Sequence, residues 1–141
     1  MSVSFEIVAN GLRVARMRAN ILASNLANIE TTKTESGEPY KKKMVIQREI
    51  PVSSFQTELG KFTLTAPTVQ AVVTDNKPPK LIFDPTHPDA DQNGYVKYPD
   101  INPIEAMTEM LSASRVYQAQ IEVLKSFSEM SQAARELLRS L

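Results

Sequence analysis

The distribution of proline constrains this chain more than any other feature of its sequence. All nine prolines lie between Pro39 and Pro103. Proline has no backbone N–H to donate and disrupts a helix interior, so no long helix fits in this central region. Residues 1–38 and 104–141 are free to be helical. The order helix, irregular or β-rich middle, helix predicts an α+β protein.

Apolar residues in the N-terminal segment recur at alternating steps of three and four. This is the a/d pattern of a helix that packs lengthwise on another helix. The stripe consists of Phe5, Val8, Leu12, Ala15, Ala19, Leu22, Leu26 and Ile29. Arg13, Arg16 and Arg18 lie off the stripe, as a solvated face requires. Gly11 and several asparagines lower the helix propensity, so we expect this helix to depend on packing.

The C-terminal segment begins with a clear helix-start signal. Asn102 suits the N-cap, Pro103 the first helical position, and Glu105 the position of a capping-box carboxylate. A second stripe with steps of three and four follows, interrupted at Gln120 and Ser131. It consists of Met110, Ala113, Tyr117, Leu124, Phe127, Ala134, Leu138 and Leu141. We expect the two terminal helices to form a coiled-coil-like pair.

A further apolar line runs beside the C-terminal stripe. It recurs every seven residues and consists of Val116, Val123, Met130 and Leu137. A single antiparallel partner buries one stripe of a helix, so this line would stay exposed in a lone chain. Exposed apolar stripes mark interfaces. Head-to-tail contacts between copies that do not close into a ring build a helical tube. The pattern therefore predicts a polymerising helical protein.

The central region contains short runs that are typical of strands. Met44–Ile50, Thr68–Thr74 and Lys80–Phe83 are rich in β-branched or apolar residues and are bounded by turn-forming residues. They predict a small β-rich domain or an extended, hairpin-like arm. The expected organisation is an N-terminal helix with an assembly motif in residues 1–34, a β-rich segment in 35–100 and a long helix in 101–141.

Composition excludes several classes of function. Lysine and arginine number 16 and aspartate and glutamate also 16, so no global positive field favours nucleic acid as the main partner. Cysteine is absent, which excludes disulfides, thiolate metal sites and cysteine nucleophiles. No stretch approaches the roughly 20 apolar residues that a membrane span requires, so no membrane insertion is expected. The polar N-terminus lacks a signal-peptide core, so we expect any export to occur without cleavage.

Two motifs at opposite ends of the chain point to one family. Residues 23–32, Ala-Ser-Asn-Leu-Ala-Asn-Ile-Glu-Thr-Thr, closely resemble the N-terminal signature of bacterial flagellar rod and hook proteins. Residues 110–119, Met-Leu-Ser-Ala-Ser-Arg-Val-Tyr-Gln-Ala, are similar to the matching C-terminal helix. The short middle, with residues 38–43 and 84–96, resembles the proximal-rod branch of that family. Residues 99–102, Pro-Asp-Ile-Asn, depart mildly from its more usual Pro-Asn-Val.

The resemblance implies a structural, non-enzymatic role in the proximal rod of the basal body. The subunit would polymerise through its terminal helices into part of the hollow drive shaft that transmits torque. It implies export through the flagellar type III apparatus into the periplasm-spanning rod. The implied partners are copies of the chain and other rod proteins (FlgB, FlgF, FlgG and FliE-like subunits). The expected assembly contacts are Leu12, Leu22, Asn25, Leu26, Asn28, Met110, Arg115, Tyr117, Leu124 and Phe127.

Two alternatives stay open on the sequence. Residues Asp89–Asp100 nearly match a calcium-binding loop, with oxygen-bearing side chains at positions one, three, five and twelve and Gly94 at six. Pro88 and Pro99 fit such a loop poorly, so a turn centred on Gly94 is the preferred interpretation. The basic N-terminal helix could instead lie on lipid, although its alanine-containing stripe disfavours insertion. His87, the one histidine, has no identifiable catalytic partner, and no cofactor or metal is expected.

Overall fold

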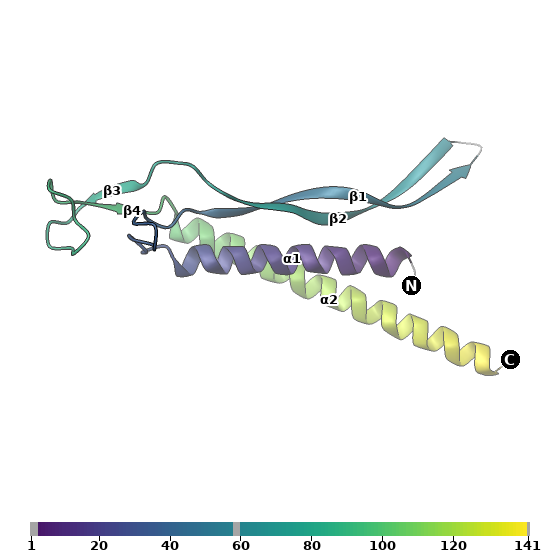
Figure 1. Cartoon of the computed structure of the whole chain (residues 1–141). Helices are drawn as coiled ribbons and strands as arrows, with labels where there is room; N and C mark the ends of the chain where they lie inside the picture. Colours follow the sequence, from purple (N-terminus) through teal and green to yellow (C-terminus); the bar gives the residue numbers. More distant parts are fainter. Residues whose placement is uncertain (1–2, 58–59, 141) are drawn as a thin grey trace.

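The computed structural model describes residues 3–57 and 60–140 of the chain (Figure 1). Two long helices, α1 (Val3–Ala27) and α2 (Pro103–Ser140), enclose a central region of four strands in the sequence. The strands are β1 (Lys43–Thr57), β2 (Gly60–Thr74), β3 (Lys80–Phe83) and β4 (Tyr95–Tyr98). The predicted α+β class, with paired terminal helices and a small β-rich centre, is confirmed.

The two helices run antiparallel and differ in length (Figure 1). Helix α1 has 25 residues and α2 has 38, so α2 is longer by about 20 Å at 1.5 Å per residue. The predicted N-cap is confirmed, since Asn102 Oδ1 accepts the backbone N–H of Ile104 at 3.0 Å. The C-terminal turns of α2 extend past the N-terminal end of α1 (Figure 1). Among the described residues, the last turns of α2 therefore lie beyond α1.

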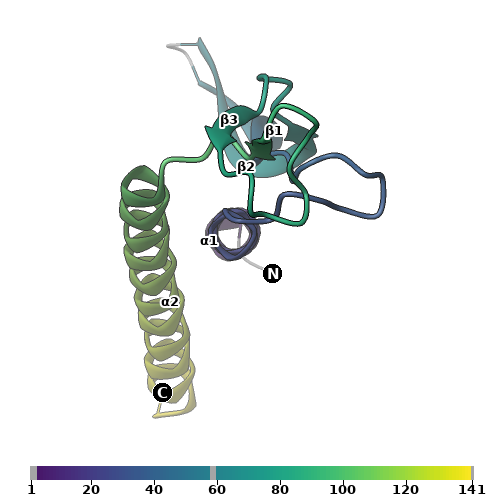
Figure 2. The same ribbon diagram turned by 90° about the vertical axis from the view of Figure 1, so that its left-hand side faces the viewer.

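Strands β1 and β2 form a long antiparallel ribbon, the β1–β2 arm, that lies along α1. Figure 2, which views α1 end-on, shows the ribbon and α2 on two different sides of this helix. Helix α1 is thus the central element of the molecule. It packs against α2 with one face and against the β1–β2 arm with another. Strands β3 and β4 form a separate two-stranded sheet at the far end of the molecule from the C-terminus (Figure 1).

The predicted strands were too short in the arm and one strand was missed. Lys80–Phe83 is observed as predicted, but β1 and β2 extend well past Met44–Ile50 and Thr68–Thr74 and contain Pro51 and Pro67. In a two-stranded ribbon each strand has one unpaired edge, so proline is tolerated there. The register shifts between Pro51 and Ser53, which is the irregularity expected beside a proline.

The missed strand, β4, follows the turn centred on Gly94. Gly94 has φ +81°, a backbone conformation that favours glycine, and an added Cβ would lie 2.9 Å from the Phe83 ring. The preferred turn is therefore confirmed. Tyr95–Tyr98 is too short to show a period, so its pairing with β3 decides its conformation.

The buried core is small and lies where the helices and the arm meet. Tyr40, Ile101 and Ala106 form its centre, and Leu26 and Ile29 pack against them. All eight members of the predicted N-terminal stripe are buried or half-buried. The C-terminal stripe is covered only as far as Phe127. Ala134 and Leu138 are exposed because α1 does not reach them, and Leu141 lies outside the described residues.

Candidate assembly interface

Asn25 connects the end of α1 to the start of the β1–β2 arm. Its side chain is 1% exposed, and its Nδ2 donates to the carbonyl of Lys43 at 2.8 Å. Its Oδ1 accepts the backbone N–H of Lys43 at 2.8 Å and the Tyr40 hydroxyl at 3.0 Å. The amide thus pairs with Lys43 as a neighbouring strand would. The interaction fixes the arm beside α1 at the point where the arm begins.

Asn28 shapes the exit from α1. Its Nδ2 donates to the Ser24 carbonyl at 2.8 Å, and its own backbone N–H donates to the same carbonyl at 3.1 Å, in the last turn of the helix. Its Oδ1 accepts the Thr31 hydroxyl at 3.2 Å, and the Thr31 carbonyl accepts the N–H of Tyr40 at 3.1 Å. The two asparagines of the N-terminal motif therefore close a loop that returns the chain to the helix.

Small residues allow α1 and α2 to approach closely. An added Cβ on Gly11 would lie 3.1 Å from Nε2 of Gln120, so these two residues face each other across the helix pair. Gln120 is one of the two residues that interrupt the predicted apolar stripe. Its Oε1 is buried without a hydrogen-bond partner in the described part of the chain. Ala15 and Ala113 line a narrow crevice nearby.

The predicted assembly residues fall mostly inside the chain's own packing. Asn25 and Leu22 are buried, Arg115 is exposed, and the rest are half-buried. The half-buried group consists of Leu12, Leu26, Asn28, Met110, Tyr117, Leu124 and Phe127. Asn25 and Asn28 bond to the segments that follow α1 and to its last turn, Arg115 is exposed, and the apolar members are buried or half-buried on α1 and α2. Their part in contacts between subunits stays a prediction.

Helix α2 exposes two apolar surfaces to solvent. The predicted second line is uncovered, with Val116 50%, Val123 45% and Met130 59% exposed. Sequence reasoning missed another surface in the first turns of α2, formed by Ile104, Met107 and Leu111. Their spacing of three and four residues carried that signal, but it was hidden beside the more regular stripes. Exposed apolar surface of this extent on a small chain indicates contact with other subunits.

The segment Asp89–Asp100 is a strand-forming turn, and the calcium alternative finds no support. The Asp91 carboxylate accepts the backbone N–H groups of Asn93 at 2.8 Å and Tyr95 at 2.9 Å. Asp89 Oδ2 accepts the Thr32 hydroxyl at 2.7 Å. Residues 95–98 pair with β3 instead of wrapping around a cation. Within residues 3–57 and 60–140, no three histidine, aspartate or glutamate side chains gather as a metal site would require.

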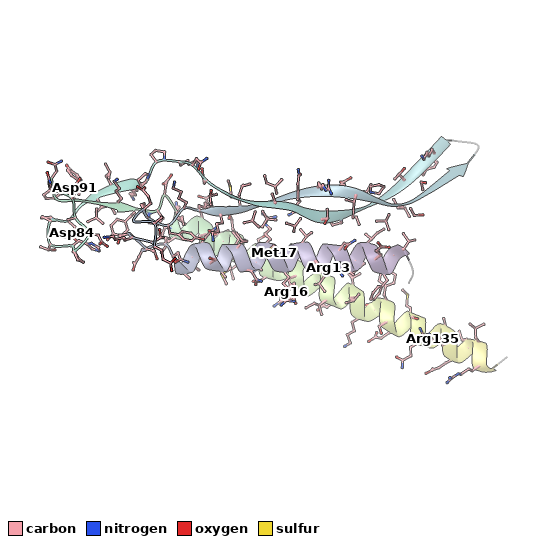
Figure 3. The ribbon with its side chains drawn as sticks, viewed as in Figure 1. Arg13, Arg16, Met17, Asp84, Asp91 and Arg135 are labelled. Atoms are coloured by element: carbon pink, nitrogen blue, oxygen red, sulfur yellow. The ribbon has the colours of Figure 1, made fainter. Side chains whose placement is uncertain are left out.

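The neighbouring Asp84 and His87 have structural roles in the same loop. Asp84 Oδ1 accepts the Thr86 hydroxyl at 2.6 Å and the Thr86 N–H at 3.1 Å. These hydrogen bonds lower the pKa of the Asp84 carboxyl. His87 Nδ1 accepts the Asp89 N–H at 3.1 Å. Figure 3 shows Asp84 and Asp91 at the end of the molecule that carries β3 and β4.

Neither described helix contains an apolar stretch long and uncharged enough to cross a membrane.

Together, a central helix, a longer partner helix with uncovered apolar surface and a projecting arm define an assembly subunit. This class of protein builds larger structures through its elongated faces. Comparison with known proteins identifies the family.

Residues 92–137 match the family described as flagellar basal body rod FlgEFG protein, C-terminal. The flagellar basal-body rod protein FlgC of Salmonella typhimurium is 37% identical over 127 residues, covering 89% of each chain. FlgC of Borreliella burgdorferi is 31% identical over 146 residues and 96% of each chain. FlgC of Bacillus subtilis is 31% identical over 144 residues and 95% of each chain. The chain therefore belongs to the FlgC family of flagellar basal-body rod proteins and is a structural component of the rod.

Proposed function

We propose that the chain polymerises through α1 and α2 to form the proximal part of the rod. In this role its terminal helices build the wall of a hollow shaft that transmits torque. Catalysis has no part in this role. The chain would be exported through the flagellar type III apparatus without N-terminal cleavage. It would assemble with copies of itself and with FlgB, FlgF, FlgG and FliE-like subunits.

The observation that carries this proposal is the uncovered surface of α2. The residues Val116, Val123 and Met130 recur at heptad spacing and remain roughly half exposed. A heptad line is the surface by which one helix packs lengthwise on another. Val116 and Met130 border the contact with α1, beside Ala15 and Phe5, yet about half of each side chain stays exposed. This exposed half supports a second helix from another subunit.

The same architecture suits a shaft under torsion. Helices of about 38 Å and 57 Å offer long lateral contacts, at 1.5 Å per residue. Dispersion contacts are individually weak but add up over such lengths, so the load is distributed over many atoms. Long packed helices can therefore resist twisting without a few dominant bonds.

Complementation of a strain that lacks the gene tests the proposal. The intact chain is expected to restore swimming and rods in electron micrographs of basal bodies. Chains that lack residues 1–28 or 125–141 are expected to restore neither, because each lacks one helix or its projecting end. Immunoblots of the variants show whether they accumulate to the level of the intact chain.

Normal rods and normal swimming in the strain without the gene would contradict a role in the rod. Rods restored by a chain without residues 125–141 would contradict polymerisation through α2 while leaving rod membership in place. The two results separate the location of the protein from its mode of assembly.

A further inference from the structure

One flank of the exposed line on α2 is acidic. Glu122 and Glu129 precede Val123 and Met130 and are exposed, whereas the exposed Arg115 precedes Val116, so the acidic stretch begins at Glu122. In a heptad, the positions beside an apolar line border the helix contact, and their charges help to select the partner helix. Glu122 and Glu129 occupy such positions beside the exposed line. The exposed line on α2 therefore has an acidic border along Val123 and Met130.

Helix α1 has a free face of the opposite charge. Arg13, Arg16 and Asn20 are exposed on a side that neither the arm nor α2 covers, and Met17 beside them is 40% exposed. Figure 3 shows Arg13, Arg16 and Met17 along this helix.

Within residues 3–57 and 60–140 these arginines form no ion pair. Among the described residues, the one ion pair joins Lys77 and Asp75 at 3.7 Å. Arg13 makes a long hydrogen bond of 3.5 Å to Asn10 on its own helix. Arg13 and Arg16 thus lie beside the apolar side chain of Met17, and the carboxylate on the same side of the helix, Glu6, lies two turns away from Arg13.

We propose that the line Val116–Val123–Met130 of α2, with its border Glu122 and Glu129, docks on the face Arg13–Arg16–Met17 of α1 in a second copy. This contact rests on the proposed function and specifies which helix faces meet. Unlike charges across a helix contact favour the correct partner and fix its position. Met17 supplies adaptable apolar surface for the valines.

Contact between α2 of one copy and α1 of the next explains how the assembly can keep adding copies. The two faces lie on different parts of one chain, so each copy offers an α2 face to one neighbour and an α1 face to another. Contacts of this heterologous kind extend into a helical array when the rotation does not close. Contact between the α2 helices of two copies would place their acidic borders near each other, which disfavours it.

Charge exchange in the strain that lacks the gene tests the contact. We expect Arg13→Glu with Arg16→Glu to abolish rods and swimming, since like charges would then meet. We expect Glu122→Arg with Glu129→Arg to do the same. The chain that carries all four substitutions is expected to regain rods, because the pairs are restored with reversed sign.

The control replaces Glu35 and Glu38, which are exposed in the loop after α1, by arginine in the Arg13→Glu, Arg16→Glu chain. This control chain has the same net charge as the unsubstituted chain, but its new arginines lie away from the proposed contact. We expect it to form no rods. Circular dichroism of the purified variants is expected to match the unsubstituted chain, since all four positions are exposed. Rods from either double variant, or no rods from the fourfold variant, would overturn the contact but leave the function in the rod standing.

Cross-linking supplies a second measurement, which the lack of native cysteine makes clean. In basal bodies, Met17→Cys with Val123→Cys is expected to give a ladder of linked copies with a flexible bis-maleimide. Each single variant is expected to stay monomeric. Dimers from Val123→Cys by itself would indicate contact between α2 helices. Monomers from the double variant, or a product of this chain with a different polypeptide, would also overturn the proposal.

Discussion

At the scale of single residues, Asn25 shows how one amide can organise three segments. Its oxygen and nitrogen pair with both backbone groups of Lys43, and its oxygen also holds the Tyr40 hydroxyl. A buried polar group costs free energy unless it is paired, so the site depends on all its partners. The N-terminal motif therefore stabilises the subunit itself before any neighbour is present.

Replacement of Asn25 by alanine is expected to destabilise the chain by about 1–3 kcal/mol, the cost of leaving buried hydrogen-bonding groups unpaired. Urea denaturation followed by circular dichroism measures the change. Asn20→Ala is the matched control, because Asn20 is exposed on the same helix. Equal stabilities for the two variants would contradict a structural role for Asn25.

The Asp84 carboxyl gives a prediction about pH. Hydrogen bonds from Thr86 lower its pKa in the folded chain from the usual 3.8. Its stabilising contribution is therefore present above the unfolded pKa and is lost as the pH falls through the lower folded pKa. In Thr86→Val, which loses the hydroxyl, we expect this pKa to rise toward 3.8 in a carbon-detected NMR titration. Thr63→Val, exposed on the arm, is expected to leave it unchanged.

At the scale of elements, the helix pair combines a close approach with a polar interruption. Gly11 makes room for Gln120, whose Oε1 is buried without a hydrogen-bond partner in the described residues. A polar residue within an apolar seam lowers stability and helps to specify register. The contact between these two residues therefore marks the alignment of α1 against α2.

Gln120→Leu is expected to raise the free energy of unfolding by about 1 kcal/mol, because the desolvated amide oxygen is removed. Thermal denaturation measures the shift. Gln118→Leu, on the exposed side of the same helix, is expected to change stability by less than about 0.5 kcal/mol. A lower midpoint for Gln120→Leu would show that the amide is paired or that leucine does not fit opposite Gly11.

At the scale of the whole molecule, α2 is longer than α1. We therefore expect the part of α2 beyond α1 to serve assembly, and the part packed on α1 to serve folding of the subunit. Residues 131–139 are exposed, and the C-terminal turns of α2 extend past the N-terminal end of α1 (Figure 1). Isolated helical turns have little stability in water, and tertiary packing supplies most of it. We therefore expect the projecting end of α2 to be stabilised by a neighbouring subunit.

Deletion of residues 131–141 is expected to change the free energy of unfolding by less than about 0.5 kcal/mol, as for changes at exposed positions in general. The same deletion is expected to abolish rods in the complemented strain. Circular dichroism and electron microscopy measure the two effects. A strongly destabilised monomer would contradict the separation of folding from assembly.

The sequence determined the features that follow from local chemistry and period. Proline placement separated the helical ends from the centre, and the Asn102 cap marked the start of α2. The heptad spacing of Val116, Val123 and Met130 predicted an apolar line that stays exposed in a lone chain. These features depend on residues near one another in the chain, so they are legible without a fold.

Only the tertiary structure decided which partners those residues meet. The extension of β1 through Pro51, the pairing of β4 with β3 and the bonds from Asn25 to Lys43 all join residues distant in sequence. The charged face of α1 became recognisable once the arm and α2 were seen to cover its other sides (Figure 2). Period shows that a helix face is apolar or charged, but packing determines which face remains free.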